Sequence, residues 1–230
     1  MHQLKGGILD ESKLLQLDKS DRQIKMIPDG QFQISDIQSY LGANWDIQEA
    51  EKIRDSYFKH RDGVSVCLRE FPEKSRRQLI VKRSRNKAGV TQMERERFSH
   101  ETEITTPIET LIDEFNKKYE ETSIDVKKCP LECIIETRRM NSMNDDGVII
   151  RRDVSEVLGE TGKVKLPETI EIDCADKGKM KDIRKKISTA LKKIGIDLKD
   201  VTTKETKEKM AIRVLDEQGN TKNQKLGEDR

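Results

Sequence analysis

The chain has few of the residues from which a large apolar core is built. Only 33% of its 230 residues are hydrophobic and 4% are aromatic, whereas 38% are charged. No apolar run approaches the ~20 residues that a membrane-spanning helix needs, and the N-terminus lacks the apolar segment of a signal peptide. We therefore expect a cytoplasmic protein with no membrane partner, whose fold has an unusually charged interior.

Residues that bind zinc are also scarce. No two cysteines are spaced as Cys-x-x-Cys, and the histidines are too dispersed to complete a ligand set. The residues concerned are Cys67, Cys129, Cys133 and Cys174, with His2, His60 and His100. This pattern predicts four reduced thiols rather than a zinc site.

An excess of charge of one sign is missing as well. The chain has 45 basic and 43 acidic residues, so its composition indicates neither a general nucleic-acid footprint nor attraction to a membrane surface. Any binding of an anion must depend on where individual charges are placed.

What the sequence does contain is charge at alternate positions of strand-like segments. Glu101 and Glu103 are two residues apart, as are Glu171 and Asp173, so each pair must lie on one face of its strand. Basic side chains occur in similar segments, around Arg69 and Lys82. Each pair taken alone is typical of the solvent face of an antiparallel sheet, but its recurrence predicts a sheet that gathers carboxylates and cations on one side.

The apolar patterns predict a single principal domain. Strands are expected near residues 21–27, 64–70, 78–83, 99–104, 131–139, 148–154 and 169–173, and helices near 107–120 and 179–194. Residues 1–19 are interpreted as an N-terminal extension, residues 20–210 as the domain, and residues 211–230 as a C-terminal tail. The lysines of the second helix are interpreted as its solvated side.

The order of these segments resembles the CYTH members of the triphosphate tunnel metalloenzymes over roughly residues 20–210. The matching segments are 55–58, 66–69, 79–82, Glu101 with Glu103, 137–139, 148–153 and 170–173. The resemblance implies an α+β fold in which a closed eight-stranded antiparallel barrel, with helices packed outside, forms a tunnel for a triphosphate and a divalent metal. Its known members include inorganic triphosphatases, thiamine triphosphatases and class IV adenylyl cyclases.

The resemblance also implies which residues form the site. Carboxylates would hold Mg²⁺ or Mn²⁺, which prefer oxygen ligands: Asp21, Glu101, Glu103, Glu171 and Asp173. Cations would hold the phosphates: Lys25, Arg69, Lys82, Arg97, Arg138, Arg139, Arg152 and Lys204. Glu101, Glu171 and Lys25 would take part in catalysis.

Departures from the family pattern weaken its metal-binding half. The first strand of the family carries Glu-x-Glu-x-Lys, whereas this chain has Asp21, Gln23 and Lys25; Phe71 and Ser99 replace two expected arginines. Phosphate binding is thus better preserved than catalysis.

Three functions remain open at this point. The first is metal-dependent hydrolysis of a triphosphate-containing small molecule, with class IV adenylyl cyclase activity as a variant. The second is a binding module for a nucleotide or polyphosphate without turnover, and the third is an interaction protein whose charged strands face water. A 5′-triphosphate RNA end is left open as a partner, and the oligomeric state is not predicted.

Overall fold

A large antiparallel sheet with helices on it forms the fold. The computed structural model describes residues 23–42, 44–59, 64–86, 93–120, 124–125, 128–160 and 162–225. The ten strands are β1 (Gln23–Met26), β2 (Trp45–Ile47), β3 (Glu51–Phe58), β4 (Val64–Phe71), β5 (Arg76–Asn86), β6 (Met93–Glu103), β7 (Leu131–Asn144), β8 (Val148–Gly159), β9 (Gly162–Lys165) and β10 (Thr169–Cys174). The helices are α2 (Ile34–Leu41), α3 (Ile108–Lys118), α4 (Lys177–Lys193), α5 (Leu198–Val201) and α6 (Lys207–Lys225), with a 3₁₀ turn η2 (Pro72–Lys74).

The strands pair in the order β1-β10-β8-β7-β3-β4-β5-β6, with β2 added beside β7 and β9 beside β8. The predicted mixed α and β architecture with an antiparallel sheet is confirmed, but the predicted closed barrel of eight strands is wrong: the sheet has ten strands and is open. The free edge of β1 is occupied by a different segment. The amide of Ile27 donates to the carbonyl of Val201 at 2.8 Å, and the amide of Thr203 donates to that of Lys25 at 3.0 Å. These bonds satisfy the edge that would otherwise have paired with β6 to close the sheet.

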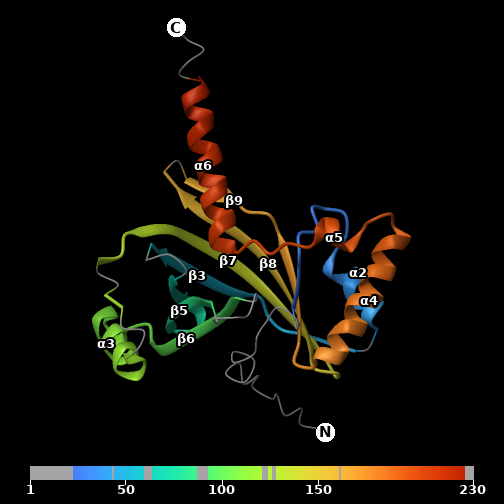
Figure 1. Cartoon of the computed structure of the whole chain (residues 1–230), viewed down its shortest axis with the longest axis horizontal. Helices are drawn as coiled ribbons and strands as arrows, with labels where there is room; N and C mark the ends of the chain where they lie inside the picture. Colours follow the sequence, from blue (N-terminus) through green and yellow to red (C-terminus); the bar gives the residue numbers. More distant parts are fainter. Residues whose placement is uncertain are drawn as a thin grey trace.

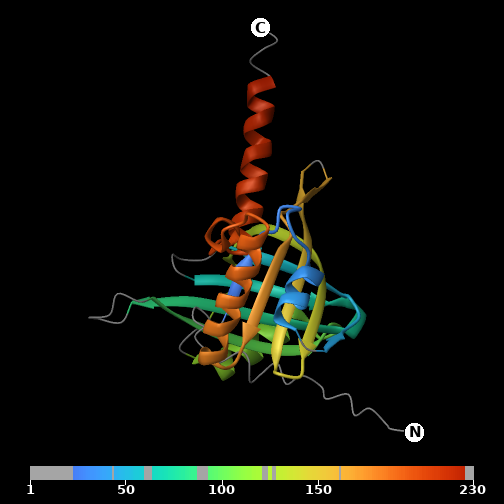
Figure 2. The same ribbon diagram turned by 90° about the vertical axis from the view of Figure 1, so that its right-hand side faces the viewer.

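Two groups of helices cover one face of the sheet, which we call the outer face. At one end, α3 buries Leu111, Ile112 and Phe115 against β4 and β5. At the other end, α4 buries Met180, Ile183, Ile187 and Leu191 against β1, β8 and β10, with α2 beside it. Figure 1 shows these two groups at opposite ends of the sheet, and Figure 2 shows α2 and α4 together.

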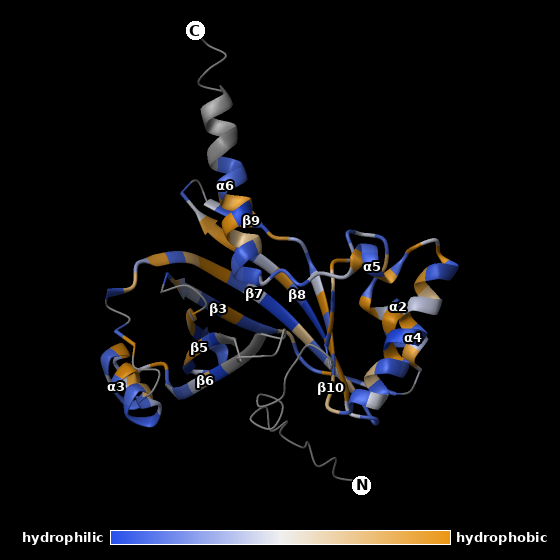
Figure 3. Ribbon diagram, viewed as in Figure 1, coloured by the Kyte–Doolittle hydropathy of each residue, from blue (hydrophilic) through white to orange (hydrophobic). Residues whose placement is uncertain are grey.

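The opposite face, which we call the inner face, is partly covered by the start of α6. Ala211 is fully buried in a cluster with Tyr57, Cys67, Cys133 and Ile135 of the inner face. The expected C-terminal tail from residue 211 therefore begins inside α6, which continues to Lys225. In Figure 3 the blue of polar residues follows much of β7 and β8, through the middle of the sheet.

No helix among the described residues is long and apolar enough to cross a membrane.

Candidate functional site

Strand register brings charged side chains from distant parts of the chain onto the inner face. Directly opposed residues of an antiparallel pair lie on the same face. Asp55 of β3 is opposite Arg69 of β4, and Arg139 of β7 is opposite Asp153 of β8. The register then adds Arg151, Glu171 and Lys25 in a row across β8, β10 and β1.

Two arginines of the inner face are held by buried aspartates. Arg69 donates to Asp55 from Nε at 2.7 Å and from Nη2 at 2.8 Å. Arg139 makes the same two bonds to Asp153, each at 2.8 Å. Asp55 is fully buried and Asp153 is 2% exposed. Such bidentate pairs fix the plane of the guanidinium group, because two parallel bonds allow it no rotation.

The pKa values of these groups follow from burial opposed by charge. Burial alone would raise the pKa of Asp153, but the charges and hydrogen bonds of Arg139 and Lys207 hold it well below its ordinary value. Burial likewise opposes the lowered pKa of Asp55, which the charge of Arg69 produces. Both aspartates are therefore ionised at neutral pH and serve as fixed counter-ions.

The first turn of α6 contributes a further cation. Lys207 donates from Nζ to Asp153 Oδ2 at 2.8 Å and to Thr137 Oγ1 at 3.0 Å. Its side chain is only 13% exposed. Asp153 thus anchors two positive groups, one from β7 and one from α6.

A second group lies at the β1 end of the inner face. Lys25 donates from Nζ to the carbonyl of Glu205 at 2.9 Å and lies 3.9 Å from Glu171 Oε1. Burial lowers the pKa of Lys25, an effect that Glu171 opposes and Lys207 reinforces. Gln23 donates its amide to Glu171 Oε2 at 3.2 Å, and Arg151 forms an ion pair with Asp173.

The sequence-predicted residues are distributed unevenly. Lys25, Arg69, Arg139, Glu171 and Asp173 lie in the charged part of the inner face just described. By register, four further residues also lie on the inner face but on the far strands β5 and β6: Lys82, Arg97, Glu101 and Glu103. Glu101 is exposed there and pairs with Arg76 at 2.8 Å.

Three predicted cations do not face this group. Register places Arg138 and Arg152 on the outer face, where Arg138 is exposed and Arg152 binds Glu168 through two hydrogen bonds of 2.8 and 2.7 Å. Lys204 is exposed in the segment before α6. Asp21 lies outside the described residues.

The sequence reasoning passed over Asp55, Arg151, Asp153 and Lys207 as site residues. A signal for two of them exists: Asp55 and Arg69 are 14 residues apart, as are Arg139 and Asp153. This spacing joins an aspartate and an arginine across each of two hairpins. No comparable pattern marks Lys207.

The candidate metal ligands do not fit a metal ion as they are arranged. Among the described residues, no three His, Cys, Asp or Glu side chains gather in a group that could hold one. Glu171 and Asp173 lie on β10, next to the β1 edge, whereas Glu101 and Glu103 lie on β6 at the opposite edge. Glu101, Glu171 and Asp173 each already contact a cation or an amide donor.

Comparison with solved structures supports the fold. A putative adenylyl cyclase from Hippeastrum with a dominant triphosphatase activity matches with a TM-score of 0.50 and 14% identity, over 80% of this chain and 91% of that chain. A conserved hypothetical protein from Pyrococcus furiosus matches with a TM-score of 0.48 and 15% identity, over 82% and 98% of the two chains. A protein from Pyrococcus horikoshii gives 0.47 and 14%, with the same coverage. No family model and no curated protein sequence matches the chain.

Proposed function

We propose that the inner face binds a small molecule containing a triphosphate, through cations supplied by five elements. These cations are Lys25, Arg69, Arg139, Arg151 and Lys207. The observation that carries the proposal is that Arg139 lies close enough to Arg69 for their like charges to repel each other. Keeping two guanidinium groups together in a largely buried site costs free energy, which an anion bound between them recovers.

The unused donors of the two arginines support this proposal. A guanidinium group has five N–H donors. Asp55 and Asp153 each engage only Nε and Nη2 of their arginine, so the Nη1 donors are left for another acceptor. Because phosphate groups match the planar fork of arginine, they are the acceptors that such an arrangement favours.

Titration calorimetry with tripolyphosphate tests the binding. The informative variant is Arg69→Lys, which keeps the charge but loses the fork and should weaken binding by roughly tenfold, the factor that ~1.4 kcal/mol gives. Lys74→Ala, at an exposed site on η2, is the control. Equal binding by both variants and by the unaltered protein would show that the inner face is not the site.

A second candidate function is hydrolysis of the bound triphosphate with Mg²⁺ or Mn²⁺. The fold shared with the Hippeastrum protein favours it, and Glu171 with Asp173 are the carboxylates closest to the cations. Since these side chains do not form a metal site by themselves, we assign them no catalytic step. Phosphate release from ATP and tripolyphosphate, measured with and without each ion, tests hydrolysis, and detection of cyclic AMP tests the cyclase variant. Binding without either product would leave the protein as a triphosphate-binding module.

A further inference from the structure

Helix α4 carries a concentration of positive charge that the inner face does not use. Of its 17 residues, eight are basic and one, Asp182, is acidic. Its apolar side is buried against the sheet, so the basic residues occupy the remaining, solvent-facing part of its circumference. A local surface of this kind is compatible with the near-neutral charge of the whole chain.

Most of this charge has no counter-ion in the described part of the protein. Lys179 pairs with Asp146 at 3.1 Å, and Arg184 donates to the carbonyl of Gln23 at 3.4 Å. Five other lysines of α4 make no ion pair with a described carboxylate: Lys181, Lys185, Lys186, Lys192 and Lys193.

Three of these lysines form a straight row. With 100° between successive residues, positions 181, 185 and 192 fall within about 40° of one another around the helix, and they are separated by ~6 and ~10 Å along its axis. The row therefore presents cations at regular intervals along one line, as a phosphate backbone presents anions.

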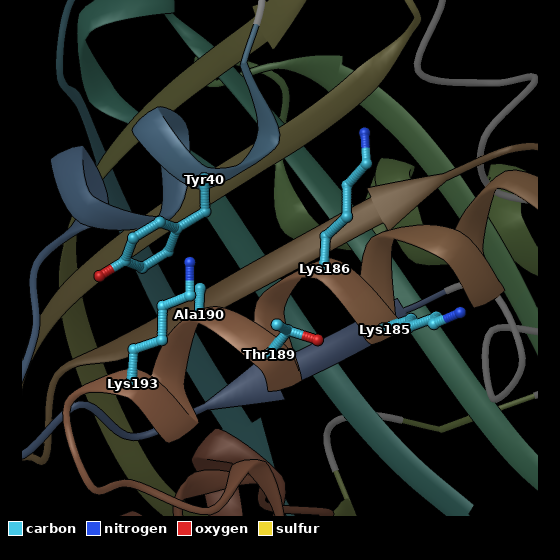
Figure 4. Close-up of a pocket in the computed structure, with 6 residues that line it drawn as sticks. All are labelled: Tyr40, Lys185, Lys186, Thr189, Ala190 and Lys193. Atoms are coloured by element: carbon cyan, nitrogen blue, oxygen red, sulfur yellow. The ribbon is translucent and has the colours of Figure 1, made fainter.

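A hollow with an aromatic wall adjoins this face of α4. Its volume is about 340 Å³, and it is lined by Tyr40 of α2 with Lys185, Lys186, Thr189, Ala190 and Lys193 of α4. Figure 4 shows the ring of Tyr40 on the α2 side of the hollow, across from Ala190 and Lys193. A half-buried flat ring beside lysines offers a surface on which a nucleobase stacks while its phosphates meet the cations.

We propose that this face of α2 and α4 binds single-stranded nucleic acid, with the lysines on the phosphates and Tyr40 beneath a base. A membrane surface fits less well, because a helix that lies on lipid inserts an apolar side, and the apolar side of α4 is already buried in the core. An acidic peptide would satisfy the lysines but has no need of the aromatic wall. The proposal does not depend on the triphosphate site.

Fluorescence anisotropy with a 20-nucleotide strand of mixed sequence tests the proposal. The strand carries a 5′-hydroxyl and a 3′ label, so that it offers no terminal phosphate to the inner face. Lys185→Gln with Lys192→Gln should weaken binding and reduce the slope of log K against log salt concentration by about 1.4, because each phosphate that a lysine no longer neutralises lowers the slope by ~0.7. Lys117→Gln with Lys118→Gln, an equal change of charge on exposed residues of α3, should leave affinity and slope unchanged.

Tyr40 supplies an independent measurement. Tyr40→Leu keeps an apolar side chain but removes the flat ring, and should weaken binding by about 5- to 10-fold, whereas Tyr40→Phe should bind as the unaltered protein does. Equal affinities for the α4 and α3 double variants would overturn the proposal. So would binding of phosphatidylserine vesicles or polyglutamate, with the same dependence on Lys185 and Lys192, by a protein that does not bind the strand.

Discussion

Replacing Asp153 by asparagine should destabilise the protein strongly, because this carboxylate neutralises two buried cations. Asp153 is 2% exposed, while the side chains of Arg139 and Lys207 are 16% and 13% exposed. Asparagine keeps the shape and one acceptor oxygen but leaves both cations without a charge partner. Breaking a buried ion pair in this way costs about 3–5 kcal/mol. For a chain of this size, that corresponds to a fall of roughly 6–20 °C in melting temperature, at 2–4 °C for each kcal/mol.

Asp146→Asn is the matched control, since it also removes an aspartate that pairs with a lysine. The Asp146–Lys179 pair spans 3.1 Å, but its side chains are 65% and 49% exposed. An exposed pair of this kind contributes about 0–1 kcal/mol. Melting followed by circular dichroism should therefore separate the two variants clearly. A change below ~2 °C for Asp153→Asn would refute the view that Asp153 is a buried counter-ion.

The same variant links stability to the proposed ligand. Because Asp153→Asn leaves the inner face with one more uncompensated positive charge, tripolyphosphate should raise its melting temperature by more than it raises that of the unaltered protein. A smaller rise in the variant would argue that the anion binds elsewhere.

The pH dependence has a defined sign. The pKa of Asp153 is lower in the folded protein than its unfolded value of about 3.9. The carboxylate therefore contributes stability that is complete above about pH 5 and is lost as the pH falls below ~4 towards the folded pKa. Asp153→Asn should remove this part of the acid sensitivity, so the two melting curves should approach each other as the pH falls from 5 to 3.

Three further predictions concern the edges of the inner face. Gln23→Glu places a second carboxylate beside Glu171, where the two repel each other, so it should lower the melting temperature without metal, and Mn²⁺ should reverse the loss; calorimetry that finds no gain in Mn²⁺ affinity would exclude a metal at this position. Lys25→Ala should weaken tripolyphosphate binding about tenfold while exposed Lys199→Ala does not, and equal affinities would remove β1 from the site. Ala211→Asp buries a charge among apolar residues and should release α6 from the inner face, which faster amide exchange in residues 207–215 would reveal and unchanged exchange would contradict.

The sequence predicted most of the strands and the faces of several charged residues, because a period of two is visible without knowledge of the partner strand. Glu171, Lys25 and Arg69 were placed correctly on one face for this reason. The choice between neighbours was less secure. Arg138 was preferred to Arg139, yet register turns Arg138 outward and Arg139 inward, since a shift of one residue reverses the face.

The open edge of the sheet could not be predicted in the same way. Alternation of residue types states which side of a strand is buried, but it is silent on which strand lies next to it. The segment that occupies the β1 edge, around Thr202, is short and polar and resembles a loop. Its pairing with β1 depends on α5 and α6, which carry the chain past that edge, and no local pattern encodes this path.

Fixed counter-ions explain how the inner face tolerates so much charge in a small core. Asp55 and Asp153 are almost entirely shielded from solvent, and they hold Arg69, Arg139 and Lys207 in place. Cations held in this way need little rearrangement when an anion arrives, so less of the interaction energy is lost in ordering flexible side chains. The aspartates also carry negative charge, which limits how tightly any anion binds. The balance between these two effects makes the inner face selective for a ligand with several negative charges, since a single phosphate cannot reach enough of the unused donors to overcome the carboxylates beside them.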